Sequence, residues 1–434
     1  MVKSISRRSV LGGVAGLTAS ALVSKAFAAA QDVGNTLHAP DLTPDALASH
    51  EGFWDDVAKQ YDVTPNITNL ENGYWGIMSR PVQAVHHEML AMINRDNTHY
   101  ARQHYAKAEA DVLACLAEFL NVGADELLFT RGASESLQLL IGGYNGLSPG
   151  DGVLLADLDY PAMKTAMRWL KDRRGADVIE IDLPEPASFD GFVAAYAAAF
   201  DANPHIKLCL LTHLNNHTGA IHPVRAIADM ARARGIDCIV DAAHSVGQVD
   251  FDLSELGADF VGINLHKWIG APIGNGLAYV RRGRVPDIDT FMGVPGSNSD
   301  IRNLLYTGTT SFAARLTIPA ALAFHQSIGT ANKEARLRYL RNIWVGAVRD
   351  LDAVDVLTPD DPRMVAALTS FRLRGMTSTK DNNALAARLR DEFGILTVRR
   401  TSPARGDCIR ITPSIYNAPA DSRKLADALR VIAG

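Results

Sequence analysis

Residues 238–244 read Cys-Ile-Val-Asp-Ala-Ala-His, and residues 260–268 read Phe-Val-Gly-Ile-Asn-Leu-His-Lys-Trp. Each stretch predicts a short buried strand with a charged residue at or just past its carboxyl end, Asp241 in the first and Lys267 in the second. Taken alone, an aspartate there often caps a helix, and a lysine after a strand is often only a solvated charge. In an α/β sheet, however, both side chains would emerge at the edge where such folds bind ligands.

The surrounding sequence predicts such a sheet, because short apolar strands alternate with helices from residue 127 onward. The predicted strands are Leu127–Thr130, Val153–Ala156, Val178–Ile181, Lys207–Thr212, Cys238–Ala242, Phe260–Leu265 and Leu277–Val280. The helices between them include Ser134–Gly143, Ala162–Arg173, Phe189–Phe200 and Pro223–Arg234. We therefore expect an α/β fold with a mostly parallel seven-stranded sheet covered by helices. The last strand follows Lys267 through a short glycine-rich turn without room for a crossover helix, so it should run antiparallel.

The pattern changes after residue 312 and predicts a smaller α+β domain at the C-terminus. Its predicted elements are the helices Phe312–Ser327 and Asn332–Leu351, strand Leu368–Leu373, helix Asp381–Glu392, strand Cys408–Thr412 and helix Asp421–Ile432. The expected organisation is an N-terminal arm over residues 31–75, a large domain over 76–312, and linking helices with the small domain over 313–434.

The composition is that of an ordinary globular chain: 434 residues, 47% of them hydrophobic, with a formal charge of −5. The absence of basic runs argues against nucleic-acid binding. The four cysteines (Cys115, Cys209, Cys238 and Cys408) do not have the spacing of metal ligands, so no metal site is expected.

The first thirty residues have the pattern of an export signal rather than of a fold. Ser6-Arg7-Arg8-Ser9-Val10-Leu11 is a twin-arginine pattern, and Ala26-Phe27-Ala28 ends the weakly apolar run that comes after it. That run is too short and too rich in glycine and alanine to cross a bilayer, so no stable membrane span is expected. We expect residues 1–30 to be a twin-arginine signal peptide, cleaved near residues 28–30, and the mature protein to be periplasmic.

Three further stretches place polar groups at strand ends. Thr130-Arg131-Gly132-Ala133-Ser134-Glu135-Ser136 turns from a strand into a helix, which suits either an anion site or a simple serine cap. Asp159-Tyr160-Pro161 offers an aromatic ring that could stack on a flat heterocycle. Asn215-Asn216-His217-Thr218-Gly219 is unusually polar for a plain turn. Together with an amine for a Schiff base and a carboxylate for a pyridinium nitrogen, these groups are what pyridoxal phosphate requires.

With these motifs, the chain resembles the fold-type I, class V aminotransferases, in the branch that includes isopenicillin N epimerases and, more distantly, cysteine desulfurases. The resemblance rests mainly on residues 215–219, Asp241-Ala242-Ala243-His244 and His266-Lys267-Trp268, and covers nearly all of the chain after the signal. It implies that Lys267 holds the cofactor as an internal aldimine and moves the Cα proton to give a quinonoid, with Asp241 keeping the ring nitrogen protonated. The remaining implied cofactor contacts are Gly132, Ala133, Ser134 and His266 for the phosphate, Asn216 and His244 for the phenolic oxygen, and Tyr160 for the ring face.

The resemblance implies a role for two more residues. Thr309, in Tyr306-Thr307-Gly308-Thr309-Thr310, matches a threonine that reaches the phosphate of the partner subunit, which implies a homodimer with shared active sites. Arg410 matches the arginine that clamps a substrate carboxylate. Further candidates for the substrate pocket, none of which the sequence favours individually, are Asn72, Tyr74, Tyr100, Arg102, Arg399 and Arg400.

The sequence indicates the cofactor more clearly than it indicates the reaction. Desulfurases carry a nucleophilic cysteine where this chain has Ile395, and Cys408 lies in a strand pattern, so persulfide chemistry is not expected. The sequence favours an aminotransferase acting on an amino acid or a peptidyl amino group, with an epimerase or racemase as the alternative. A C–S lyase or a non-catalytic binding protein is less favoured, and a nicotinamide enzyme is excluded because no G-x-G-x-x-G follows the first strand.

Overall fold

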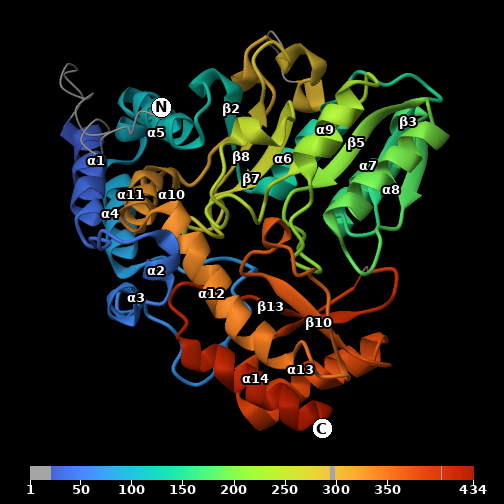
Figure 1. The fold of residues 1–434 in the computed structure, drawn as a ribbon. Coiled ribbons are helices and arrows are strands. Elements are labelled where there is room, and N and C mark those ends of the chain that lie inside the picture. Colours follow the sequence, from blue (N-terminus) through green and yellow to red (C-terminus); the bar gives the residue numbers. More distant parts are fainter. Residues whose placement is uncertain (1–20, 294–298, 402) are drawn as a thin grey trace.

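The computed structural model describes residues 21–293, 299–401 and 403–434, and its large domain is built on a seven-stranded sheet (Figure 1). The strands are β2 (Leu127–Thr130), β3 (Gly152–Ala156), β4 (Asp177–Ile181), β5 (Ile206–Thr212), β6 (Asp237–Asp241), β7 (Phe260–Asn264) and β8 (Gly276–Val280). Their order is β2-β8-β7-β6-β5-β3-β4. The strand β8 runs antiparallel to both of its neighbours, and the other pairs are parallel. The predicted α/β sheet and its one reversed strand are confirmed.

Both faces of this sheet are buried. Along β5, Leu208 and Leu210 belong to one hydrophobic cluster, while Cys209 and Leu211 belong to another. This alternation is expected, because successive side chains of a strand point to opposite faces. The covering helices are α6 (Ala133–Gly143), α7 (Pro161–Arg174), α8 (Phe189–Ala202) and α9 (Val224–Arg232). Burial on both faces explains why the strands read as nearly continuous apolar runs.

A group of helices lies beside the sheet, and segments from before and after the sheet both contribute to it. It contains α4 (Arg80–Gln103), α5 (Tyr105–Leu120), α10 (Phe312–Leu316), α11 (Ile318–Ile328) and the long α12 (Thr330–Val348). The helix predicted over Phe312–Ser327 is thus two helices, α10 and α11, with Pro319 in the first turn of the second. Proline is favoured there because its missing N–H group would have no intrahelical partner.

The small domain is a four-stranded antiparallel sheet with the order β12-β13-β10-β9, packed against α13 (Thr379–Phe393) and α14 (Pro419–Ala433). Its strands are β9 (Val354–Val356), β10 (Thr369–Leu373), β12 (Val398–Arg400) and β13 (Cys408–Ile411). The two central strands match the sequence prediction. The two edge strands do not, because three-residue segments carry too little periodicity to be recognised.

The N-terminal arm connects the small domain to the lysine. Its strand β1 (Thr68–Asn69) pairs in parallel with β11 (Ile395–Leu396), and Glu71 forms a bridge with Thr412. The arm then reaches Gly76, whose amide donates to the carbonyl oxygen of His266 over 2.9 Å. A Cβ atom at Gly76 would lie 1.9 Å from the carbonyl oxygen of Lys267. The arm therefore passes the catalytic loop at a distance that only glycine allows.

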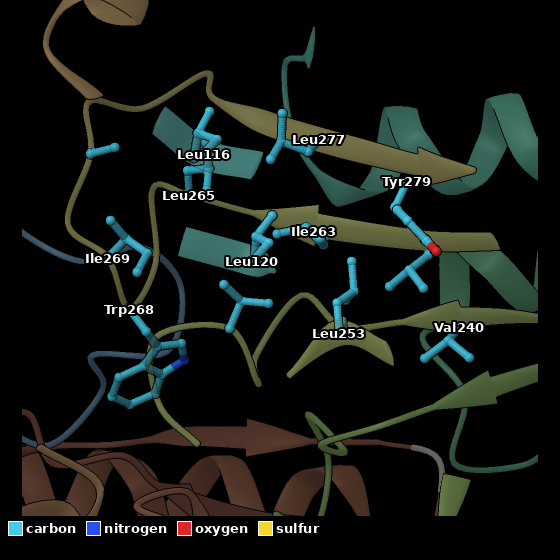
Figure 2. Packing of buried hydrophobic residues seen from close by; sticks show 14 of the residues in the cluster. Leu116, Leu120, Val240, Leu253, Ile263, Leu265, Trp268, Ile269, Leu277 and Tyr279 are labelled. Carbon is cyan, nitrogen blue, oxygen red and sulfur yellow. The ribbon is translucent and has the colours of Figure 1, made fainter. Parts of the chain in front are cut away.

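The loop that carries Lys267 is held by hydrophobic packing. Figure 2 shows the buried side chains of Leu265, Trp268 and Ile269 grouped with Leu116 and Leu120 of α5. Close packing of this kind fixes a loop because its side chains cannot move without opening a void.

The N-terminal region bears on the predicted export signal. The pattern at Ser6–Leu11 lies outside the described residues. The helix α1 (Ala21–Gly34) runs through the predicted cleavage point, and Ala26, Ala30 and Val33 are buried where it packs against α11. Ala26 and Ala30 therefore take part in packing in the uncleaved chain, which the sequence did not lead us to expect. Among the described residues, no helix has both the length and the apolar character to cross a membrane.

We predict that Gly76→Ala lowers the stability of the folded protein by about 1–3 kcal/mol, because the added methyl group must displace the arm or the lysine loop. Thermal unfolding measures this. The matched control is Gly346→Ala in α12, where an added Cβ meets no atom within 4 Å. That substitution should stabilise the protein by about 0.5–1 kcal/mol, because alanine is the better helix former. Equal midpoints for the two variants would contradict the close approach at Gly76.

Candidate active site

The carboxyl edge of the large sheet borders a cavity of about 510 Å³ that is also lined by residues of the arm and of the small domain. Among its lining residues are nearly all of those predicted from sequence: Gly132, Ala133, Ser134, Tyr160, Asn216, Asp241, His244, His266, Lys267 and Arg410. The structure therefore brings together groups that lie far apart in the chain. Tyr74 and Arg400, which the sequence left as unselected candidates, line the same cavity.

Lys267 and His244 form the centre of this site. Lys267 Nζ lies 2.9 Å from His244 Nε2, and Trp268 Nε1 lies 3.5 Å from His244 Nδ1. Because an indole N–H group can only donate, Nδ1 accepts, and a neutral imidazole then carries its proton on Nε2. That proton is donated to Nζ, and an amine accepts a hydrogen bond only when it is uncharged. With this tautomer of His244, Lys267 is neutral, which is the nucleophilic form.

The electrostatics agree with this assignment. Burial lowers the pKa of Lys267 to about 7; Arg410 and Arg400 also lower it, while Asp241 opposes them. Burial likewise holds the pKa of His244 well below its ordinary value. Removing a charged amine or imidazolium from water is costly, so both groups favour their neutral forms.

Asp241 lies at the end of β6, and its Oδ1 accepts the amide of Ala243 over 2.9 Å. Burial raises the pKa of this carboxyl, against the effect of that amide and of Lys267. A buried carboxylate needs a cationic partner, which a protonated ring nitrogen would provide. A second carboxylate, Asp159, lies behind it and accepts from Thr212 Oγ1 over 2.7 Å. Its pKa is raised to about 7 by burial, and sequence reasoning assigned it no role.

The first turn of α6 offers backbone amides for an anion, but one of these amides already has a partner. The amide of Ala133 already donates to Asn264 Oδ1 over 2.7 Å, so the amide and hydroxyl of Ser134 remain for a phosphate. A Cβ atom at Gly132 would lie 3.0 Å from Asn264 Oδ1 and 3.1 Å from His266 Cε1, which explains the small residue there. Asn264, whose part in this turn the sequence analysis missed, precedes His266 by two residues.

The remaining lining groups suit a flat heterocycle. Asn216 Oδ1 is buried and has no hydrogen-bond partner within the described residues. Tyr160 stands at the start of α7 and is 39% exposed, as expected for a ring at the edge of an open pocket. An unpaired buried amide, an acidic partner for a ring nitrogen, a neutral lysine and an anion site together fit pyridoxal phosphate.

Arg410 is buried in the cavity wall but is not free. Its Nη2 pairs with Glu71 Oε1, its Nε lies 3.3 Å from Glu71 Oε2, and its Nη1 donates to the carbonyl oxygen of Asn216 over 3.1 Å. Arg400 Nη2 lies 3.4 Å from the same Glu71 Oε1. Sequence reasoning missed Glu71, although the next residue, Asn72, was among the candidates for the pocket.

Two other predicted features lie outside this cavity. Thr309 is exposed and does not line the pocket of its own chain, so its role toward a partner subunit stays a prediction. Cys408 is buried in β13, and burial raises the pKa of its thiol to about 12. Within the described residues, no group of three or more histidine, cysteine, aspartate or glutamate side chains is arranged to hold a metal ion.

The fold and site define a pyridoxal-phosphate enzyme of fold type I. The sequence profile of the aminotransferase class-V family matches residues 79–395, so the chain belongs to this family. It is 25% identical to the isopenicillin N epimerase of Streptomyces clavuligerus, over 88% of this chain and 98% of that protein. It is 27% identical to the isopenicillin N epimerase of Amycolatopsis lactamdurans, over 87% and 98% respectively.

Solved structures confirm the fold. A cysteine desulfurase from Thermococcus onnurineus NA1 superposes with a TM-score of 0.74 at 20% identity, covering 87% of this chain and 98% of that one. The cystine C–S lyase C-DES, in complex with cysteine persulfide, gives a TM-score of 0.73 at 22% identity, with 84% and 97% coverage.

We predict that cofactor uptake by the apoprotein depends on pH with a midpoint near 7. The pKa of Lys267 is lowered to about 7, so the amine is charged below that pH and neutral, and therefore reactive, above it. The rate at which added pyridoxal phosphate produces a visible absorption band should rise through about pH 7 and then level off. Lys267→Ala is the control and should give no such lysine-dependent band. A rate still climbing near pH 10 would show an ordinary lysine instead.

Proposed function

We propose that the protein is an aminotransferase-type enzyme acting on the amino group of an amino acid or a peptidyl amine. The observation that supports this best is the buried Lys267 amine, 2.9 Å from His244 Nε2, in one cavity with the buried Asp241. Bound there, pyridoxal phosphate supplies an aldehyde that captures amines and a ring that withdraws electrons from the substrate Cα.

The protein residues divide the remaining work. Asp241 would hold a proton on the ring nitrogen, and the α6 turn with Ser134 would bind the phosphate. Lys267, when its amine is free, lies where it can take a proton from Cα and return it elsewhere. His244 keeps that amine oriented and uncharged through the hydrogen bond to Nζ.

An epimerase is the second candidate. The two isopenicillin N epimerases match this chain over 98% of their own lengths. Epimerisation requires that the proton return to the opposite face of Cα, and therefore a second acid or base across the pocket from Lys267. Elimination is a third outcome, because a putative L-cysteine desulfhydrase of Oryza sativa is 27% identical over 65% of this chain and 64% of that protein.

We also propose that the enzyme is an exported homodimer. The support for a partner subunit is that Thr309 and its neighbour Tyr306 are exposed, the latter by 74%, although the resemblance assigns Thr309 to a cofactor phosphate. The support for export is the twin-arginine pattern at Ser6–Leu11. Light scattering and the N-terminal sequence of the secreted protein test the two proposals separately.

The reaction type is tested by incubating the holoenzyme with amino acids in D₂O. We expect an oxo acid product and loss of the visible cofactor band, because a transaminase would keep the substrate's amino group on the bound cofactor while water supplies the oxygen of the oxo acid. Deuterium at Cα with inverted configuration would instead establish the epimerase. Release of a β-substituent with an oxo acid and ammonia would establish elimination. Mass spectrometry and chiral chromatography separate these outcomes.

Cys408→Ala should leave turnover within about twofold of the wild type, because a buried thiol with a pKa of about 12 is not a nucleophile at neutral pH. The cavity left behind should cost about 1 kcal/mol of stability. Steady-state kinetics and thermal unfolding measure the two effects. Loss of turnover with an unchanged unfolding midpoint would instead point to persulfide chemistry.

A further inference from the structure

A second buried lysine lies against the loop that carries Lys267. Lys333, near the start of α12, is only 5% exposed, and its Nζ donates to the backbone carbonyl oxygen of Trp268. Among the described residues, no carboxylate forms an ion pair with this amine, and burial lowers its pKa to about 7. A buried amine without an acidic partner is costly. Such a costly group indicates a function other than packing.

The amine of Lys333 has two acceptors. Besides the carbonyl oxygen of Trp268, His325 Nδ1 in α11 lies 3.5 Å from Nζ. His325 Nε2 lies 3.0 Å from Thr330 Oγ1, so an imidazole protonated on Nε2 fits both of its contacts. Burial, with a smaller effect of Lys333, holds the pKa of His325 well below its ordinary value, which keeps this ring neutral. A lysine has at least two N–H groups in either protonation state, so Lys333 can donate to both acceptors at any pH.

Trp268 connects Lys333 to the amine of Lys267. Within the described part of the chain, Lys333 is the only donor to the Trp268 carbonyl. The indole of the same residue, one of the buried groups in Figure 2, lies with its Nε1 3.5 Å from His244 Nδ1. On the other side of that imidazole, His244 Nε2 lies 2.9 Å from Lys267 Nζ. We refer to Trp268, with Lys333 on one side and His244 on the other, as the tryptophan link.

Loss of the Lys333 donor should affect the imidazole of His244. The carbonyl of the buried Trp268 would have no partner, and the loop should shift until that group finds another donor. The contact between the indole and His244 is at the long end of hydrogen-bond distances, so a small shift would break it. The imidazole could then carry its proton on Nδ1 and accept from the ammonium form of Lys267 through Nε2. The amine of Lys267 would become harder to deprotonate.

We propose that Lys333 is a positioning residue: by holding the carbonyl of Trp268, it keeps the indole on His244. The tautomer of His244 that faces Lys267 is thereby fixed. Lys333 does not line the cavity, so it acts only through the tryptophan link. The role rests on the proposed function, because it presupposes that the amine of Lys267 reacts with pyridoxal phosphate. The other charged groups that act on the pKa of Lys267 lie outside the tryptophan link and are Asp241, Arg410, Arg400 and Glu71.

The test follows the charge of Lys267 through the pH dependence of cofactor uptake. Full-length apoprotein is mixed with pyridoxal phosphate between about pH 5 and pH 10, and the rate at which the visible cofactor band appears gives a midpoint for each variant. Titration of the cofactor itself is common to all variants and cancels in the comparison. Lys333→Met removes the donor at similar volume, Lys333→Gln keeps an uncharged donor, and Trp268→Phe removes the indole N–H group.

Trp344→Phe is the matched control for stability. Trp344 is fully buried in the same helix as Lys333, but it packs in the core of the small domain and not against the lysine loop. This variant should lower the midpoint of thermal unfolding and leave the pH midpoint of cofactor uptake at the wild-type value. A merely structural contribution of Lys333 would give the same result in Lys333→Met.

We expect the pH midpoint to rise by about one unit in Lys333→Met and in Trp268→Phe, because one unit corresponds to the contribution of a single hydrogen bond. The uptake rate at a pH below both midpoints should fall about tenfold. The double variant should show no further shift, since both substitutions break the same tryptophan link. Lys333→Gln should shift less than half as far as Lys333→Met, because a donor remains although the charge is lost.

The proposal is overturned if either single variant keeps the wild-type midpoint, or if the two shifts add in the double variant. A shift in Lys333→Gln of half that in Lys333→Met or more also overturns it, because the charge and not the position of Lys333 would then be responsible. Lys333→Leu takes the place of Lys333→Met where the latter does not fold. Failure of the proposed function looks different: the visible band is then absent from wild type or survives in Lys267→Ala, and the positioning role fails with it.

Discussion

The structure depends on keeping one lysine amine uncharged in a buried position. Burial alone makes the ammonium form of Lys267 costly, and the imidazole of His244 gives the neutral amine a donor at 2.9 Å. The buried Asp241 opposes this by favouring a positive charge nearby. A cofactor with a cationic ring nitrogen resolves the conflict, because it supplies the positive charge that the carboxylate requires and leaves the amine free to react.

This arrangement exists only when distant parts of the chain are assembled. The sheet edge carries Asp241, the loop after β7 carries Lys267, and the arm passes the lysine carbonyl at Gly76. The arm is held in turn by the small domain through β1 and β11. Closure of the pocket therefore depends on the contact between the arm and the small domain. A change that destabilises this contact should expose the amine of Lys267 to water and restore its charge.

How much of this could be predicted from the sequence depends on the range of the contacts involved. The seven strands, and the placement of Asp241 and Lys267 at their ends, come from local periodicity and were predicted. Ala133 is paired with Asn264, 131 positions away, and Arg410 with Glu71, 339 positions away. Such pairings leave no local pattern, so the sequence could not show that the guanidinium of Arg410, which lines the pocket, is engaged by Glu71.

The groups of the site are divided between the large sheet on one side and the small domain with the arm on the other. The carboxyl edge of the large sheet provides the lysine, the aspartate and the anion site, which every reaction at Cα needs. Arg400 and the Glu71–Arg410 pair, by contrast, come from the small domain and the arm. Changes in these segments alter which amine is bound and how it is oriented over Lys267. The candidate reactions all begin with loss of the same Cα proton and differ in where a proton returns and in whether a β-substituent leaves. Both depend on the groups around the substrate, so the choice of reaction depends on the small domain and the arm as well as on the lysine.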